Sequence, residues 1–256
     1  MRSLFKFKDK PIPWVTVALI LANVIIHILV FSSSNPEAIL STFGEHPTSI
    51  IQGEELHTLF TSMFLHANHL HIFGNMLYLS VFGVLVERRL GHKRFLAIYL
   101  IAGFIAALVT SWFWTTYLEP TSASFAVGAS GAIGGILGAC LLGFPRAKIP
   151  APVLILFLWF LTAFFNFRIF LFSSIPFILL IIYTRKIKIP AIALLLIWFV
   201  EQFFIALTII EPAPWAHLGG FMTGALLYYV LKKEKAPFHK EDRGQRKPPV
   251  PKPAAF

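Results

Sequence analysis

The sequence predicts an all-α bundle of membrane-spanning helices. Hydrophobic residues make up 57% of its 256 positions and charged residues only 13%, and the mean hydropathy is +0.73. This composition is typical of integral membrane proteins and excludes an ordinary soluble domain. The basic residues, which give a formal net charge of +10, flank the apolar segments. That placement follows the positive-inside rule and argues against a nucleic-acid partner.

Apolar residues gather in eight segments that predict helices. In chain order these are residues 12–32, 68–86, 93–115, 129–145, 151–166, 169–184, 189–208 and 215–232. The single cysteine, Cys140, lies inside one of them, which excludes a disulfide framework and a cysteine-rich metal site.

The charges between these segments predict their orientation. Residues 33–66, 117–128 and 209–216 include glutamates but neither Lys nor Arg, so we expect them on the outer side. The connections at residues 88–94, 146–148 and 185–188 and both ends of the chain are basic, which predicts that they are cytoplasmic. With both termini inside, a multi-pass protein of the cell membrane must cross an even number of times.

The chain is thereby divided into three parts. Residues 1–11 are expected to form a cytoplasmic N-terminal segment and residues 12–232 the transmembrane domain. Residues 233–256 are basic and Pro-rich with few apolar residues, so we expect a disordered tail.

Residues 151–184 form an apolar segment between two cytoplasmic anchors. The segment must therefore enter the membrane and return, with Asn166-Phe-Arg168 at its tip. Each limb has about 16 residues, short of the roughly 20 that a straight crossing needs. Two short crossings and a re-entrant hairpin both fit. We favour two crossings, because the tip is the only polar interruption.

A glycine-rich stretch, Gly128 to Gly138, carries one serine. Small residues recur at Ser130, Gly134 and Gly138, and a second small-residue stripe follows His217 at Gly220 and Gly224. Such spacing lets membrane helices pack backbone to backbone. If the two stripes face each other, His217 approaches Ser130 and can accept its proton. A packing stripe without chemistry is the alternative interpretation.

Two further polar residues, His71 and Asn75, are predicted at the same depth. Their spacing places them on one helical face, where each can donate a hydrogen bond to a developing oxyanion. The backbone N–H of Ser130 is a third donor, because the first turn of a helix has no internal acceptors. The only aspartates, Asp9 and Asp242, lie in the flanks, so a Ser–His dyad is the simpler hypothesis.

In this order, these motifs resemble the rhomboid family of intramembrane serine proteases. The matching residues are Gly128-Ala-Ser130-Gly131 for G-x-S-G, Ala216-His217-Leu-Gly-Gly220 with Gly224 for A-H-x-x-G-x-x-x-G, His71-Ile-Phe-Gly-Asn75 for H-x-x-x-N, His66 in the run before it, and Glu87-Arg88 with Gly91. Some members carry an aromatic residue four positions after the serine, stacked on the histidine. This chain has Gly134 there.

The resemblance implies a fold and an activity. It implies a six-helix core, on which residues 151–184 are an inserted hairpin. It implies that Ser130 is the nucleophile, His217 the general base, and Asn75 with His71 the oxyanion-hole side chains. Structural support is implied for Gly128, Gly131, Gly220, Gly224, His66 and Glu87. The implied partners are transmembrane substrate proteins and membrane lipid, with no cofactor and no metal.

Three other interpretations were weighed against this one. The first is an inactive rhomboid-like protein that binds transmembrane clients, which the presence of all the motif residues disfavours. The second is a transporter or channel, disfavoured because charged residues are nearly absent from the core segments. The third is a metal site at His66, His69 and His71, which lacks a thiolate or aspartate to complete a zinc set. We expect Glu201 and Gln202 to be a helix-packing pair beside the active site.

Overall fold

The computed structural model describes residues 12–118, 124–153, 155–156, 178–208 and 210–232. These residues are mostly helical. The helices are α1 (Trp14–Phe31), α2 (Pro36–Phe43), α3 (Pro47–Ile51), α4 (Thr58–Thr61), the 3-10 turn η2 (Ser62–Phe64), α5 (His69–Tyr78), the π-helical stretch η3 (Leu79–Gly83), α6 (Val84–Leu90), α7 (His92–Tyr117), α8 (Ser130–Gly143), α11 (Ala191–Thr208) and α12 (Pro212–Leu231). Two short strands are β1 (Lys148–Pro150) and β2 (Lys188–Pro190).

Four of the described helical stretches are long and apolar enough to cross a membrane: Trp14–Phe31, His69–Leu90, His92–Tyr117 and Ala191–Thr208. The protein is therefore a polytopic helical bundle. The predicted segments 129–145 and 215–232 correspond to α8 and α12. Helix α8 has 14 residues, which span about 21 Å at 1.5 Å per residue, so it is shorter than the hydrocarbon core of a bilayer.

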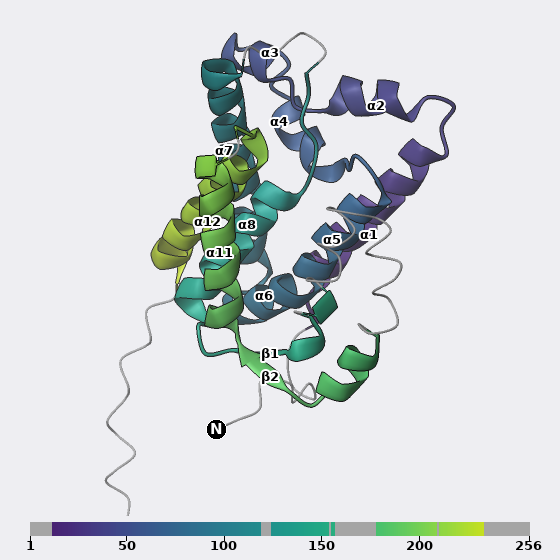
Figure 1. Ribbon diagram of the computed structural model, residues 1–256. Coiled ribbons are helices and arrows are strands. Elements are labelled where there is room, and N and C mark those ends of the chain that lie inside the picture. The colour runs from purple at the N-terminus through teal and green to yellow at the C-terminus, as the bar shows by residue number, and fades with distance from the viewer. Residues whose placement is uncertain (1–11, 119–123, 154, 157–177, 209, 233–256) are drawn as a thin grey trace, which may run out of the picture.

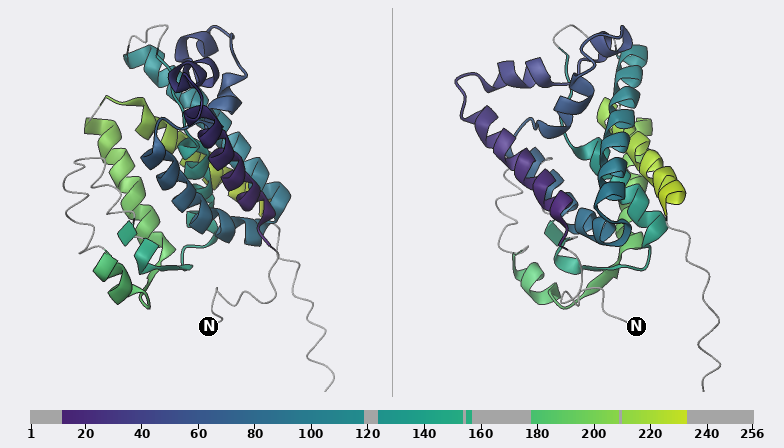
Figure 2. Two further views of the ribbon diagram at one scale, coloured as in Figure 1. Left: turned by 90° about the vertical axis from the view of Figure 1, so that its right-hand side faces the viewer. Right: turned by 180° about the vertical axis from the view of Figure 1, so that it is seen from behind.

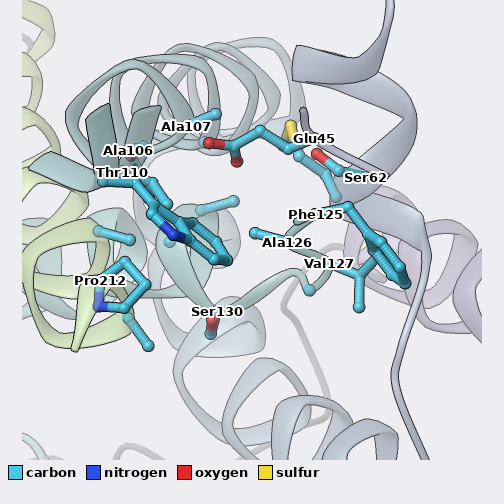
Figure 3. A pocket seen from close by; sticks show the side chains of 18 of the residues that line it. Glu45, Ser62, Ala106, Ala107, Thr110, Phe125, Ala126, Val127, Ser130 and Pro212 are labelled. Atoms are coloured by element: carbon cyan, nitrogen blue, oxygen red, sulfur yellow. Dashed lines mark hydrogen bonds between the residues drawn. The ribbon is translucent and has the colours of Figure 1, made fainter. Parts of the chain in front are cut away.

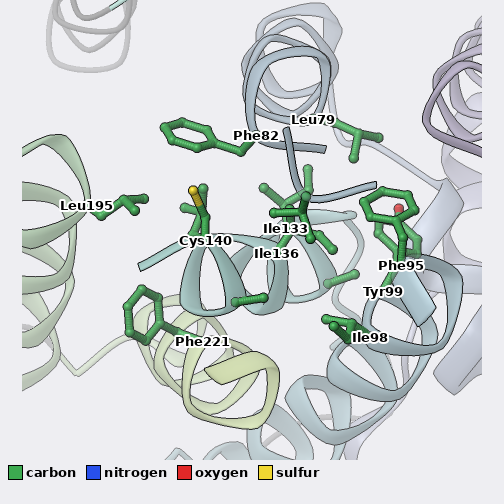
Figure 4. Close-up of a cluster of buried hydrophobic side chains, with 14 of the residues drawn as sticks. Leu79, Phe82, Phe95, Ile98, Tyr99, Ile133, Ile136, Cys140, Leu195 and Phe221 are labelled. Atoms are coloured by element: carbon green, nitrogen blue, oxygen red, sulfur yellow. The ribbon is translucent and has the colours of Figure 1, made fainter. Parts of the chain in front are cut away.

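Helix α8 lies at the centre of the bundle. Every residue from Gly131 to Cys140 is buried. Its apolar side chains meet those of η3, α7, α11 and α12 in one cluster, which includes Leu79, Phe82, Phe95, Ile98, Tyr99, Ile133, Ile136, Leu195 and Phe221 (Figure 4). Helices α1 and α11 lie on opposite flanks of the bundle (Figure 2). A helix that is covered on all sides can be short and still hold its first residue in a fixed position.

Small residues determine how α8 packs. A Cβ atom at Gly134 would lie 2.8 Å from the carbonyl oxygen of His217, and one at Gly220 or Gly224 would collide with the carbonyl oxygen of Gly131 or Gly135. Helices α8 and α12 therefore pack backbone to backbone, as the two small-residue stripes predict. Gly131 and Gly135 also face alanines of α7, so three helices meet at this junction.

Glu87, for which the sequence predicts a supporting role, ties α6 to the start of α1. Its carboxylate accepts hydrogen bonds from the backbone N–H groups of Val15 (2.9 Å) and Thr16 (2.7 Å) and from the Thr16 hydroxyl. The first N–H groups of a helix lack internal partners, so a carboxylate there satisfies them and interacts well with the helix dipole.

The connection between α1 and α5 contains the short helices α2 to α4, which the sequence did not predict. They lie at the end of the bundle opposite β1 and β2 (Figure 1). An isolated bridge joins this connection to the segment before α8, because Glu45 and Ala126 exchange both backbone hydrogen bonds, at 2.8 and 2.9 Å. The Gly128 N–H also donates to the Ser62 carbonyl at 2.9 Å. The connection between α1 and α5 thus fixes the chain directly before Ser130.

Strands β1 and β2 bring together the two ends of residues 151–184. They pair antiparallel, with Ile149 opposite Ile189. The segment therefore leaves and rejoins the core at one place. The tip Asn166-Phe-Arg168, residues 1–11 and the tail 233–256 lie outside the described residues, so their predicted arrangement is not tested by the structure.

Candidate active site

Ser130 is the first residue of α8 and is partly exposed. Its own backbone N–H belongs to the helical turn that lacks internal acceptors. Gly128, two residues earlier, has φ +140°, a conformation that residues with a side chain rarely adopt. This turn directs the chain into the helix.

His71 lies beside Ser130, and Gly128 leaves the room for both side chains. A Cβ atom at Gly128 would lie 2.8 Å from Cε1 and 2.9 Å from Nε2 of His71, and 3.6 Å from Oγ of Ser130. Any larger residue would displace the histidine ring. The structural reason for glycine at this position is thus both its backbone conformation and the approach of His71.

His217 is positioned by the α8–α12 junction. Gly134 faces the carbonyl group of His217, and a Cβ atom at Gly131, the neighbour of Ser130, would lie 3.8 Å from the carbonyl oxygen of Ala216. Ser130 and His217 therefore lie at neighbouring positions of the contact between α8 and α12. His71 is also within electrostatic range of His217. Among the described residues, no hydrogen bond joins the Ser130 hydroxyl to His217. Such bonds are often long before a substrate binds.

The second ring nitrogen of His217 has a partner that the sequence did not identify. Nδ1 of His217 lies 2.6 Å from Oε1 of Gln202 on α11. Trp198, one helical turn earlier, packs on the same imidazole with ring centroids 6.0 Å apart. Gln202 was predicted only as a packing residue near the site, and Trp198 was not singled out.

Asn75 lies one turn below His71 on α5 and is 8% exposed. Its side-chain Nδ2 is buried and, among the described residues, has no hydrogen-bond acceptor. A buried amide donor without an acceptor is costly, and such a group is often functional. The amide is thus free to donate to an oxygen that enters the site.

His66, for which the resemblance implies a supporting role, packs against two other histidines. Neither ring nitrogen has a partner among the described residues. Its ring packs against His71, with centroids 5.1 Å apart, and against His27 at 6.3 Å. Burial, with a smaller contribution from His71, lowers the pKa of His66 to about 3. A neutral imidazole is the form that can pack in this interior.

The other histidines of this region form a pair. His27 Nε2 lies 2.8 Å from His69 Nδ1, so His69 joins α5 to α1. Within the part of the chain that the structure describes, no three His, Cys, Asp or Glu side chains are grouped so that they could hold a metal ion. The alternative of a metal at His66, His69 and His71 finds no ligand set there.

A cavity of about 270 Å³ opens beside Ser130. Figure 3 shows Ser130 on one side of it and Glu45 on another, with Ser62, Thr110 and Ala106 among the lining residues. Glu45 is 5% exposed and accepts a hydrogen bond from the Ser111 hydroxyl at 2.9 Å. Burial raises the pKa of the Glu45 carboxyl to about 8, although the bond from Ser111 acts in the opposite direction. A mainly uncharged acid thus lines the same cavity as Ser130, and the sequence did not single it out.

Comparison with known proteins gives consistent matches. The Rhomboid domain family profile matches residues 53–184. RHOMBOID-like protein 6, mitochondrial, of Arabidopsis thaliana is 38% identical over 92 residues, which are 36% of this chain and 28% of the relative. Rhomboid protease AarA of Providencia stuartii is 33% identical over 150 residues, 54% of this chain and 53% of the relative. Rhomboid protease GluP of Bacillus subtilis is 40% identical over 109 residues, 43% of this chain and 20% of the relative.

The aligned parts cover only between about a fifth and a half of the lengths of these relatives. The family profile covers His71, Asn75 and Ser130 and ends before His217. Since the profile matches more than half of the chain, and the described helices form a bundle with four membrane-spanning candidates, this multi-pass membrane protein belongs to the rhomboid family.

Proposed function

We propose that the protein is an intramembrane serine endopeptidase that uses Ser130 as nucleophile and His217 as general base. The observation that supports this most strongly is the geometry around Gly128 and Gly134. These two glycines allow His71 and the His217 backbone to approach the start of α8, where Ser130 stands. Three polar residues from three helices are thereby gathered at one end of a buried helix, which is costly unless they act together.

In this mechanism, Oγ of Ser130 attacks the scissile carbonyl carbon while its proton passes to Nε2 of His217. The oxygen of the tetrahedral intermediate accepts hydrogen bonds from Nδ2 of Asn75, from a ring nitrogen of His71 and from the Ser130 backbone N–H. Collapse of the intermediate breaks the C–N bond, and His217 returns the proton to the leaving amine. Water then attacks the acyl carbon while its proton passes to His217, the C–Oγ bond breaks, and His217 returns the proton to Oγ of Ser130.

The substrates in this proposal are transmembrane helices of other proteins. A stable helix hides its carbonyl groups, and exposure of unpaired backbone groups in lipid is costly. Substrates with helix-weakening residues near the outer surface are therefore preferred. The cavity beside Ser130 is continuous with the outer connection that holds Glu45 and Ser62, so the reaction takes place near the outer face.

The orientation belongs to the same proposal. The described basic residues at the α6–α7 turn, at β1 and β2, and after α12 face the cytoplasm, and α2 to α4 face outward. Both termini are then cytoplasmic, and six helices, α8 and α12 included, form the core in the cell membrane. Residues 151–184 form a hairpin that packs outside the catalytic core, which the pairing of β1 with β2 supports.

An inactive protein that binds transmembrane clients is the alternative, and one experiment separates the two. A serine-reactive fluorophosphonate probe is added to the purified protein, to Ser130→Ala and, as a matched control, to Ser80→Ala, which changes an exposed serine. We expect labelling of the native protein and of Ser80→Ala only. Absence of labelling and of cleavage of a model transmembrane substrate by the native protein would favour the client-binding alternative.

A further inference from the structure

The residue behind the proposed base is a glutamine on another helix. Gln202 on α11 is 8% exposed, and its Oε1 lies 2.6 Å from Nδ1 of His217. A carbonyl oxygen can only accept a hydrogen bond, so Nδ1 must carry the ring proton. In that tautomer Nε2 has the free lone pair. The contact therefore selects the form of His217 that can accept a proton from Ser130.

Trp198 restricts the same imidazole through packing. It precedes Gln202 by one helical turn, so both side chains project from one face of α11. The Trp198 ring lies 6.0 Å from the His217 ring, at an interplanar angle of 38°, and stacks on Phe221 at 5.8 Å. Gly134 has no side chain that could pack on His217. Trp198 thus supplies from α11 an aromatic contact that α8 lacks at that position.

We infer that Gln202 is the positioning residue of the general base, which it holds in the reactive tautomer and orientation, while Trp198 confines the ring. The inference rests on the proposed function and deepens it: the catalytic unit becomes Ser130, His217 and Gln202. When Ser130 loses its proton to Nε2, the Nδ1 proton stays in place and continues to be donated to the Gln202 oxygen. The amide dipole stabilises the imidazolium, as a carboxylate does in a triad, but with a smaller charge.

A purely structural role for Gln202 is the competing explanation. Buried amides also join membrane helices by hydrogen bonds, so the same contact can tie α11 to α12 without any effect on the base. The two roles differ in what a substitution changes. A structural tie affects stability, whereas a positioning residue affects turnover and its pH dependence in a protein of unchanged stability.

The experiment compares Gln202→Leu, Gln202→Glu and the native protein. Gln52→Leu is the matched control, because Gln52 is exposed in the outer connection. For each protein we would measure kcat and KM with a model transmembrane substrate, the pH–rate profile, the rate of fluorophosphonate labelling and the thermal midpoint. Three other titratable groups lie near this contact. They are His71 and Tyr78 of α5 and Glu201 of α11, and they are left unchanged.

We expect Gln202→Leu to lower kcat and the labelling rate by about tenfold or more, the equivalent of one buried hydrogen bond, with KM unchanged. The acid limb of its pH–rate profile should move to lower pH, because the imidazolium loses its acceptor. Gln202→Glu keeps an acceptor and should restore turnover, with the acid limb at higher pH. Gln52→Leu should match the native protein.

Three results would overturn the inference. The first is native kcat in a folded Gln202→Leu protein. The second is a loss of activity that follows the thermal midpoint and is not restored by Gln202→Glu, which would assign Gln202 a structural role. The third is an unmoved acid limb in both variants. Failure of the proposed function is distinct, since the native protein itself would then neither cleave the substrate nor react with the probe.

Discussion

The two sides of the site are built differently. On the side of the proposed nucleophile, glycines let α8 and α12 pack backbone to backbone, and against α7 the glycines of α8 meet only the methyl groups of alanines. On the base side, α11 reaches His217 through the side chains of Gln202 and Trp198. The rest of α11 exposes large apolar residues, among them Val200, Phe203 and Leu207. The geometry on the α8 side therefore depends on glycines, which lack side chains. The geometry on the α11 side depends on the side chains of Gln202 and Trp198.

This difference predicts how each side responds to mutation. At the glycine junction, even a methyl group meets a backbone atom that cannot rotate away. On α11, a substitution that removes a contact leaves the helices in place. We thus expect stability defects from substitutions of the glycines in the junction, and catalytic defects from substitutions of the two α11 side chains that contact His217.

The largest loss of activity is expected from substitution of Ser130 or His217, which belong to opposite sides of the site. Ser130→Ala and His217→Ala should each abolish detectable cleavage of a transmembrane substrate, a fall of about 1,000-fold or more, with little change in the thermal midpoint. The double variant should be no worse than either single one, because the residues act as a unit. Substantial cleavage by purified Ser130→Ala would remove Ser130 from the proposed role.

The next effect tests the glycine junction. In Gly224→Ala, the new Cβ collides with the carbonyl group of Gly135, and we expect a loss of about 3 kcal/mol or more in stability. The matched control is Gly219→Ala on the same helix, whose Cβ would lie 3.0 to 3.3 Å from atoms of the Val109 side chain. The Val109 side chain can adjust, so Gly219→Ala should lose less stability than Gly224→Ala. Equal thermal midpoints in detergent for the two variants would contradict the comparison.

A smaller effect is expected at Asn75, which serves neither the helix junction nor the α11 contacts. Asn75→Ala removes a buried donor that has no acceptor among the described residues, so the folded state loses little. Turnover should nevertheless fall by about 100-fold, the usual effect of one oxyanion donor. Steady-state kinetics beside a melting curve would test this, and an unchanged kcat would exclude Asn75 from the oxyanion hole.

The smallest effect concerns Glu45. Its folded-state pKa of about 8 lies above the ordinary value of 4.5, so between these values the folded protein holds a proton that the unfolded chain has released. Stability must therefore fall as the pH rises through this window. Between pH 7 and pH 9 the loss should be about 1.4 kcal/mol. Glu45→Gln cannot ionise and should show a flatter stability curve, and parallel curves for the two proteins would disprove this account.

The sequence predicted the long helices of the bundle because each has a local signal, and short motifs indicated the candidate site residues, whose roles stay predictions. Helices of the bundle are long apolar runs, and Ser130, His71 and His217 stand in short motifs with small-residue spacing. The structure agrees that α8 and α12 meet along their small residues. The resemblance also supplied the family, which the comparisons confirm.

The residues that were missed depend on contacts between distant parts of the chain. Glu201 and Gln202 are neighbours on α11, and only the packing of α11 on α12 shows that Gln202 reaches His217. Glu45 was interpreted as one acid of an outer loop, and its burial results from the bridge to Ala126 and the bond from Ser111. The strands were also missed, although the triplet Lys-Ile-Pro occurs at both places, at 148–150 and 188–190.

The pairing of β1 with β2 has a consequence for how such a protein can change over evolution. Because residues 151–184 leave and rejoin the core at one ladder, their length is uncoupled from the distance between α8 and α11. Closure of a longer or shorter loop at this ladder costs little additional free energy, since the cost grows only with the logarithm of length. The length of this segment can thus change without altering how α8 packs against α12.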